Sequence, residues 1–151
     1  GAHTVRKLAV FPGPVAAISP DGRWLANSSE ETGDFEVYVQ PLVNPGGARW
    51  RITTGGGRDP VWSRDGRELF YQRDTTMFAA TVTTEPEFAA APAVALFDGP
   101  YLDSNGRWYD VAPDGRFLMV KPGWLNADRQ APLHVVLGWF DELDRRVSGR
   151  Q

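Results

Sequence analysis

The stretch Ile18-Ser-Pro-Asp-Gly-Arg-Trp-Leu-Ala26 is the first of three similar copies of one motif along the chain. The second copy is Trp62-Ser-Arg-Asp-Gly-Arg-Glu-Leu-Phe70, and the third is Val111-Ala-Pro-Asp-Gly-Arg-Phe-Leu-Met119. Their aspartates stand at positions 21, 65 and 114, so the separations are 44 and 49 residues. A repeat of about 40 to 50 residues is typical of one blade of a β-propeller. The sequence therefore predicts three blades in succession.

Each copy contains the residues of a tight turn between two short apolar runs. Its aspartate can accept hydrogen bonds from nearby backbone amides. Its glycine can adopt the positive φ that closes a bulged hairpin. We expect each turn to join an inner strand to the next strand outward. The predicted structural turn residues are Asp21, Gly22, Asp65, Gly66, Asp114 and Gly115.

Further apolar runs predict the remaining strands, and Gly- and Pro-rich stretches at 53–57 and 98–100 suit the crossings between blades. The predicted fold class is all-β, with three propeller blades over residues 5–138 that make half of a six-bladed ring. The other predicted strands are 35–39, 49–52, 68–71, 77–82, 93–97, 108–111, 117–120 and 133–137.

The two ends of the chain differ from the blades. We expect residues 1–4 to be a cloning remnant, and residues 5–11 to form one strand that belongs to no complete blade. After Gly138, residues 139–147 predict a short helix, followed by a tail to residue 151. Acidic residues come early in that helix and arginines late, as the helix dipole prefers. Its apolar face consists of Trp139, Phe140, Leu143 and Val147.

The repeated Ser-Pro-Asp-Gly-Arg turn followed by an apolar pair resembles the WD40-like repeats of TolB-type β-propellers. The stretch 54–63, Thr-Gly-Gly-Gly-Arg-Asp-Pro-Val-Trp-Ser, is similar to the link between blades in that family. The ending 135–143 resembles the C-terminus of versions joined to bacterial kinases and regulators. The resemblance implies a bacterial, non-catalytic interaction domain, and it favours a periplasmic or other extracytoplasmic setting.

Composition narrows the classes of partner. The formal net charge is −3, and no run of Lys or Arg is long enough to follow a phosphate backbone, which argues against nucleic acid. No stretch of eighteen apolar residues is present, so we expect no membrane insertion. The chain contains no cysteine, which excludes disulfides and thiolate metal ligands.

No arrangement of residues predicts catalysis, a metal site or a cofactor. Of the two histidines, His3 falls in the expected remnant, and His134 falls in a predicted strand where a structural position is favoured. Asp103-Ser-Asn-Gly106 resembles the start of a calcium loop but lacks the closing glutamate. The glycines at 55–57 precede a strand rather than a helix, which disfavours a phosphate site.

Apart from Trp139 of the predicted helix, the tryptophans divide into two groups. Trp24, Trp50, Trp62 and Trp108 fall at blade positions where we expect core packing. Trp124 falls in a Pro-rich, polar loop, where an exposed aromatic side chain could contact a partner.

The leading functional hypothesis is a non-catalytic scaffold for protein–protein interaction, as the C-terminal part of a larger bacterial sensor or regulator. The alternatives are a small-ligand or carbohydrate-binding propeller, whose central channel would hold the ligand, and a regulatory fragment of an enzyme encoded upstream.

Three blades cannot close a ring, since closed propellers have about four to eight. We therefore predict a homodimer that forms one six-bladed ring, in which the N-terminal strand of each chain pairs with strand 133–137 of the other. The competing interpretation is a fragment of a longer chain whose upstream blades complete the ring. The residues predicted to carry the strand exchange are Val5, Leu8, Val10, Leu133, Val135 and Leu137.

Overall fold

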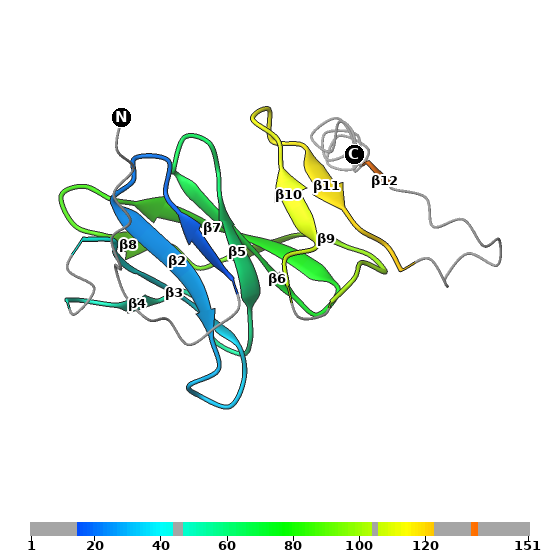
Figure 1. Cartoon of the computed structure of the whole chain (residues 1–151), viewed down its shortest axis with the longest axis horizontal. Coiled ribbons are helices and arrows are strands. Elements are labelled where there is room, and N and C mark those ends of the chain that lie inside the picture. Colours follow the sequence, from blue (N-terminus) through cyan, green and yellow to red (C-terminus); the bar gives the residue numbers. More distant parts are fainter. Residues whose placement is uncertain (1–14, 44–46, 104–105, 123–133, 136–151) are drawn as a thin grey trace, which may run out of the picture.

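The computed structural model of the chain describes residues 15–43, 47–103, 106–122 and 134–135. Throughout these ranges the regular structure is β, which confirms the predicted all-β class. Three antiparallel sheets follow one another along the chain and lie in a row, from the blue sheet through the green to the yellow (Figure 1). These sheets correspond to the three predicted blades, and we number them blade 1 to blade 3.

Blade 1 is a four-stranded antiparallel sheet in the order β1-β2-β3-β4. The first repeat turn joins β1 to β2, and Ala17 pairs with Ala26 across the hairpin. Asn27 in turn pairs with Tyr38 of the next strand. The strands are β1 (Ala16–Ile18), β2 (Trp24–Ser29), β3 (Glu36–Pro41) and β4 (Trp50–Arg51).

Blade 2 contains five strands, because its long strand β7 has two partners on one edge. The first half of β7 pairs with β9, and its last residues pair with β8. The register of β5 against β6 shifts between Arg58 and Val61, which marks a bulge in the innermost strand. The strands are β5 (Arg58–Trp62), β6 (Glu68–Arg73), β7 (Thr76–Thr83), β8 (Ala89–Ala90) and β9 (Val94–Asp98).

Blade 3 shows three strands, β10 (Tyr109–Val111), β11 (Phe117–Met119) and β12 (His134–Val135). Val135 pairs with Leu118 and His134 pairs with Met119, so β12 is antiparallel to β11. In the sheet order β10-β11-β12, the far edge of β12 has no neighbour within the described ranges.

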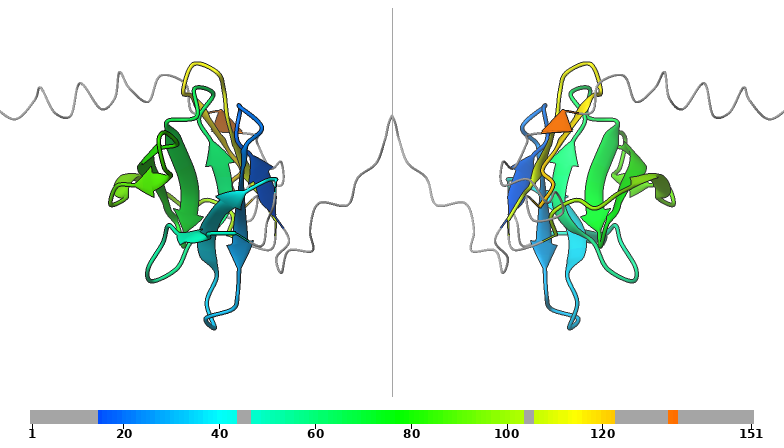
Figure 2. Two further views of the ribbon diagram at one scale, coloured as in Figure 1. Left: turned by 90° about the vertical axis from the view of Figure 1, so that its left-hand side faces the viewer. Right: turned by 90° about the vertical axis from the view of Figure 1, so that its right-hand side faces the viewer.

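Blade 2 is buried on both faces, because alternate side chains of its strands point to opposite sides. Leu69 and Tyr71 face blade 1, whereas Phe70 faces blade 3. Figure 2 shows the blue and green sheets side by side from both ends of the row. The core between blades 1 and 2 contains Ala26, Val37, Val39, Trp62, Leu69, Tyr71, Phe78, Val82 and Phe88. The core between blades 2 and 3 contains Val61, Phe70, Met77, Ala79, Phe97, Tyr109, Phe117 and Met119.

Three of the four tryptophans expected in cores pack there, and one does not. Trp62 is buried, and its Nε1 donates to the carbonyl of Ala17 at 3.1 Å. Trp24 and Trp50 form a cluster with Phe88, with ring centroids 5.1–5.5 Å apart. For Trp108 the prediction is wrong: its side chain is 38% exposed, because it precedes β10 at the end of the row.

Several predicted features lie outside the described residues: the remnant 1–4, the strand 5–11, Trp124, and the helix 139–147 with the tail that follows it. Of the strand predicted at 133–137, positions 134–135 are described. Within the described ranges, no helix is long and apolar enough to cross a membrane.

Candidate functional site

The three repeat turns share one backbone geometry. φ is +71° at Gly22, +71° at Gly66 and +81° at Gly115, in the left-handed region that glycine adopts without strain. Each glycine N–H donates to the carbonyl three residues earlier, at 2.9–3.0 Å. Each turn aspartate accepts from the amide two residues later, at 3.1–3.2 Å.

A serine completes the first two turns. In blade 2, Ser63 Oγ donates to Asp65 Oδ1 at 2.7 Å and accepts from the Glu68 amide at 2.9 Å. Ser19 makes the same pair of contacts in blade 1, with Asp21 as its acceptor. The hydroxyl therefore links the turn to the first residue of the next strand.

The third turn has Ala112 in place of serine, and Arg116 Nε donates to Asp114 Oδ2 at 2.7 Å, a contact that Arg23 also makes with Asp21 in the first turn. The bond from Ser19, together with those from Arg23, lowers the pKa of Asp21 to about 2, and the bond from Ser63 is the main cause that lowers the pKa of Asp65. The bond from Arg116 lowers the pKa of Asp114. All three carboxylates are thus ionised and engaged within their own turns, and a blade separates one from the next.

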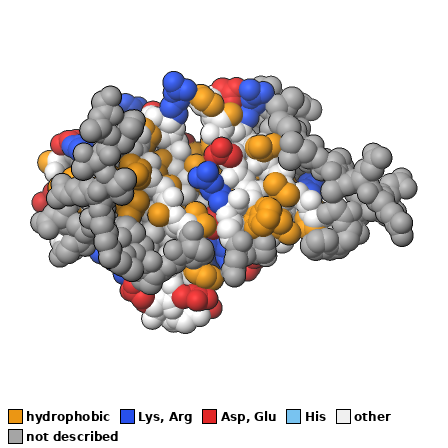
Figure 3. All heavy atoms as spheres, in the orientation of Figure 1, with side chains coloured by type: hydrophobic (Ala, Val, Ile, Leu, Met, Phe, Trp, Pro, Cys, Tyr) orange, Lys and Arg blue, Asp and Glu red, His pale blue; other side chains and the backbone are white. Residues whose placement is uncertain are grey.

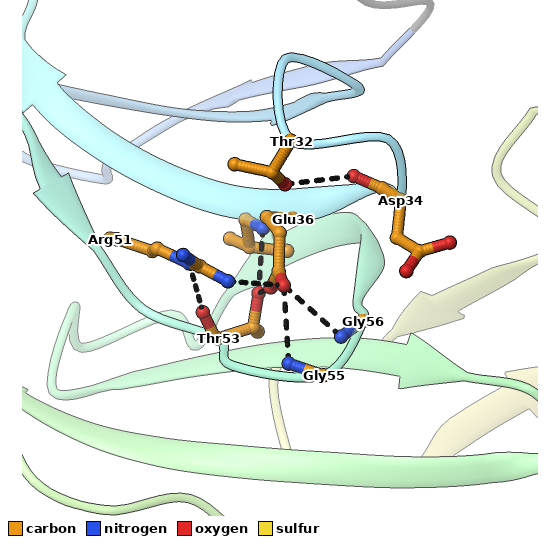
Figure 4. Close-up of polar contacts among 8 residues, drawn as sticks. Thr32, Asp34, Glu36, Arg51, Thr53, Gly55 and Gly56 are labelled. Atoms are coloured by element: carbon orange, nitrogen blue, oxygen red, sulfur yellow. Dashed lines mark hydrogen bonds and ion pairs between the residues drawn. The ribbon is translucent and has the colours of Figure 1, made fainter.

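The crossing from blade 1 to blade 2 is organised around the buried carboxylate of Glu36 (Figure 4). Arg51 Nη2 donates to Glu36 Oε1 at 2.6 Å, and Thr53 Oγ1 donates to Oε2. The amides of Gly55 and Gly56 donate to Oε1 at 3.1 and 3.3 Å. Burial by itself raises the pKa of Glu36, but these hydrogen bonds outweigh it and leave the pKa below its ordinary value.

This arrangement explains the glycines of the crossing. Gly55 and Gly56 have φ of +87° and +99°, which turns both amides toward the same carboxylate oxygen. The glycine-rich crossing therefore binds an anion, as a phosphate loop does, but the anion is the protein's own Glu36.

Asp59 lies where all three blades meet. Its backbone N–H donates to Ser28 Oγ of blade 1 at 2.9 Å. Its carbonyl accepts from Tyr109 Oη of blade 3 at 2.6 Å, and the same hydroxyl lies 3.2 Å from the carbonyl of Phe70. Asp59 is 3% exposed, and its φ is +56° within the bulge of β5. A left-handed residue other than glycine costs about 1–3 kcal/mol, which the contacts from the neighbouring blades offset.

The carboxyl group of Asp59 lies in a charged environment. Arg58 forms an ion pair with Asp103 at 3.0 Å, while no hydrogen bond to the Asp59 carboxylate is found in the described part of the chain. Burial raises the pKa of Asp59 to about 6, Asp103 acts in the same direction, and Arg58 and Arg107 oppose it. Asp59 can therefore take up or release a proton at mildly acidic pH.

The candidate binding site is a groove of about 730 Å³ between blades 2 and 3. Phe70 and Phe117 line it, with ring centroids 5.0 Å apart, and strand β9 contributes one wall. Val94 of that wall is 64% exposed, although valine favours burial. The complete lining is Ser63, Arg64, Asp65, Glu68, Phe70, Val94, Ala95, Leu96, Val111, Ala112, Pro113, Asp114, Gly115 and Phe117.

The groove brings together two of the three predicted turns. Asp65, Asp114 and Gly115 line it, whereas the turn of blade 1 lies elsewhere. At the start of the calcium-like stretch, Asp103 pairs with Arg58 at 3.0 Å, and within the described ranges no cluster of three possible ligand residues occurs. Six residues are predicted to carry the strand exchange. Of these, the described ranges include only Val135, for which the structure gives the backbone position.

Sequence reasoning did not identify Glu36, Asp59 or the groove. Glu36 looked like the polar position of an alternating strand, and the glycines that follow Thr53 were the available signal that its carboxylate is bound. Asp59 precedes a proline, which ordinarily favours extended backbone, so its positive φ had no signal in the sequence. The groove depends on how two blades lie against each other, which no local pattern encodes.

Comparison with known proteins gives one kind of match. No protein-family model matches the chain, and a search of curated proteins found no match either. Among solved structures, the chain is similar to a TolB-like protein from Agrobacterium tumefaciens, with a TM-score of 0.51 and 19% sequence identity. The match covers 74% of this chain but only 40% of the other, so this chain spans less than half of the longer protein. The chain therefore has the fold of a segment of a TolB-type β-propeller.

Proposed function

We propose that this chain is a non-catalytic propeller unit that holds other polypeptides. The observation that supports the proposal is the groove between blades 2 and 3, whose lining combines apolar side chains such as Phe70 and Phe117 with the charged residues Arg64, Asp65, Glu68 and Asp114. An apolar centre surrounded by charged groups is the usual composition of a protein–protein interface. An exposed side chain such as Val94 at its edge offers a partner an apolar contact.

The polar groups of the groove support a binding role over a catalytic one. Ser63 is the one hydroxyl side chain in the lining, and it donates to Asp65 within the turn. An activated nucleophile needs a base of suitable pKa beside it. The lowered pKa of Asp65 makes this carboxylate a weak base, so the pair serves to hold the turn.

The experiment places a photo-crosslinking residue at position 94, and in a second variant at position 43. Val43 is 73% exposed and lies outside the groove, which makes it a matched control. In the cells that produce the protein, the crosslinker at position 94 should capture a specific polypeptide that the crosslinker at position 43 does not capture. Val94→Glu should lower co-purification of that polypeptide, whereas Val43→Glu should leave its co-purification unchanged. Equal capture at both positions would contradict the proposal.

A second candidate is a small-ligand or carbohydrate site in the same groove. Its volume falls within the range of roughly 300–1,000 Å³ that small-molecule sites occupy. Thermal-shift screening of the unmodified chain and of Val94→Glu distinguishes the two: a glycan or metabolite that stabilises only the unmodified chain would favour this candidate. The more specific proposal, that the chain is the C-terminal part of a larger bacterial sensor or regulator, rests only on the resemblance of its sequence to TolB-type propellers.

A second copy of this chain is the first polypeptide that we propose as a partner. The two ends of the blade row expose apolar side chains: Ile18 of β1 is 55% exposed, Leu118 of β11 is 37% exposed, and Trp108 adjoins β10. Figure 3 shows hydrophobic side chains at the surface over β10 and β11. The free edge of β12 within the described ranges could accept an N-terminal strand, as an unpaired edge does.

Two variants test this assembly. Ile18→Glu should weaken the homodimer, because it places a charge on an end face that meets the other copy, whereas Val43→Glu should leave the association constant unchanged. Removal of residues 1–11 should weaken it further through loss of the exchanged strand. A sedimentation coefficient that neither change alters would contradict the proposed interface.

A further inference from the structure

The second repeat departs from the other two at the position before its turn aspartate, and this position lines the groove. The residue is Arg64, where the first and third repeats have Pro20 and Pro113. The turn itself does not require the arginine, because φ is +71° at both Gly22 and Gly66 and each glycine makes the same backbone hydrogen bond. Arg64 is exposed, and in the described part of the chain it forms no ion pair. Its guanidinium is therefore available to an anionic group.

The second departure replaces an aromatic residue by a carboxylate. Glu68 stands where the first and third repeats have Trp24 and Phe117. Between blades 1 and 2, Trp24 at this position packs against Trp50 and Phe88. Between blades 2 and 3, Glu68 lines the open groove instead. The groove thus lies where an aromatic side chain closes the equivalent space one blade earlier.

The carboxylate of Glu68 has no counter-charge among the described residues. Glu68 is half-buried and lies on the same face of β6 as Phe70, and no hydrogen bond or ion pair to its carboxylate is found in those ranges. Partial removal of a carboxylate from water without a partner costs free energy, which a cationic group in the groove would offset. The other two carboxylates of the lining, Asp65 and Asp114, are already bound within their own turns.

We infer that the groove binds a segment of a partner polypeptide in which an apolar side chain is flanked by one acidic and one basic residue. The acidic residue pairs with Arg64, and the basic residue pairs with Glu68. The apolar side chain contacts Phe70, Phe117 and Val94, which line the same groove. This inference deepens the proposed function and rests on it, since it names the chemistry of the polypeptide that the groove holds. Complementary charges of this kind give specificity more than affinity.

Short synthetic peptides test the inference on the full chain. They have the form acetyl-X-Ser-Phe-Ser-Z-amide, with Lys and Glu at X and Z in either order, Lys at both, Glu at both, or Gln at both. In an NMR titration, one of the mixed-charge peptides should have the lowest dissociation constant, roughly fivefold below that of the Gln peptide. This factor follows because an exposed ion pair contributes a factor of up to about five.

Charge reversal in the protein should change which peptide binds best. Arg64→Glu should make the peptide with two lysines the tightest ligand, and Glu68→Lys should do the same for the peptide with two glutamates. Arg64→Pro copies the first and third repeats, so it should keep the melting temperature and lose the preference for a mixed-charge peptide over the peptide with two lysines. Glu30→Lys is the matched control: it changes the net charge as Glu68→Lys does, but it is exposed in blade 1 outside the groove and should leave the preferences unchanged.

Three results would overturn the inference. All the peptides could bind with equal affinity, which would mean that the groove selects apolar groups alone. The preferences could be the same in the unmodified chain, in Arg64→Glu and in Glu68→Lys. Free phenylalanine could bind more tightly than every peptide, which would assign the groove to a small zwitterionic ligand.

The test separates this inference from the proposed function. If the peptides show the expected preferences but position 94 captures no specific polypeptide in cells, the assigned chemistry of the groove stands and the proposed function fails. If Val94→Glu lowers partner capture but the peptides show no preference for charge, the proposed function stands and the inference fails.

Discussion

The raised pKa of Asp59 makes stability depend on pH in an unusual direction. In the unfolded chain this carboxyl titrates near its ordinary value of 3.8, and in the folded chain near 6. Between these values the folded state binds the proton more tightly, so the free energy of unfolding falls as pH rises from about 4 to about 6. Protonated Asp59 therefore contributes its full stabilisation below pH 3.8, the pKa in the unfolded chain. This contribution is lost as the pH rises above about 6, the pKa in the folded chain.

The size of the effect follows from the shift. One pKa unit corresponds to about 1.4 kcal/mol, so a shift from 3.8 to about 6 sets an upper limit of about 3 kcal/mol. Most carboxylates with lowered pKa values, such as Asp21, act in the opposite direction and strengthen the fold as pH rises. The contribution of Asp59 must therefore be isolated by substitution.

Asp59→Asn is the appropriate change, because asparagine keeps the shape, tolerates positive φ and cannot ionise. Asp74→Asn is the matched control, since Asp74 has a φ of +53° but is exposed. Urea unfolding at pH 4, 5, 6 and 7 gives the free energy of unfolding for each chain. Relative to the unmodified chain, Asp59→Asn should gain stability between pH 4 and pH 7, and Asp74→Asn should not. Parallel curves for Asp59→Asn and the unmodified chain would refute the assignment.

Three further substitutions test how the blades are joined. Gly66→Val should destabilise by roughly 1–3 kcal/mol through backbone strain, since a Cβ there meets nothing closer than Pro20 at 3.6 Å, and an unchanged melting temperature would contradict the turn. Glu36→Gln should lower the free energy of unfolding in urea by about 1.5–3 kcal/mol, because it removes a buried charge that accepts four hydrogen bonds. The control Glu31→Gln, on the exposed surface, should change this free energy little. Tyr109→Phe should lower the free energy of unfolding by about 1–2 kcal/mol, because it removes the hydrogen bond from blade 3 to the carbonyl of Asp59. Amide hydrogen exchange should then become faster first in β10 and β11, and an equal increase across all blades would argue against this role.

The strands could be predicted from the sequence wherever a turn and an alternating apolar run coincide. The strand expected at 77–82 is observed as β7 (Thr76–Thr83), and the one expected at 93–97 as β9 (Val94–Asp98). β8 escaped notice because Ala89–Ala90 has no β-favouring side chain, and its pairing with the end of β7 is what defines it.

The candidate site could be predicted only in part. The turns that line the groove are visible as Asp-Gly pairs, since a turn is a local event. Asp59 depends instead on Ser28 and Tyr109, residues 31 and 50 positions away, which fix its backbone and bury its carboxyl group. Long-range contacts of this kind, and the exposure of Val94, arise when blades pack and have no counterpart in a window of sequence.

We propose that these three blades act by joining other polypeptides, beginning with a second copy that completes the ring. Light scattering of the unmodified chain over a range of concentrations tests it most directly. We predict a mass of twice the 16.7 kDa of one chain, with dissociation only on strong dilution. A monodisperse species of 16.7 kDa at every concentration would contradict the claim.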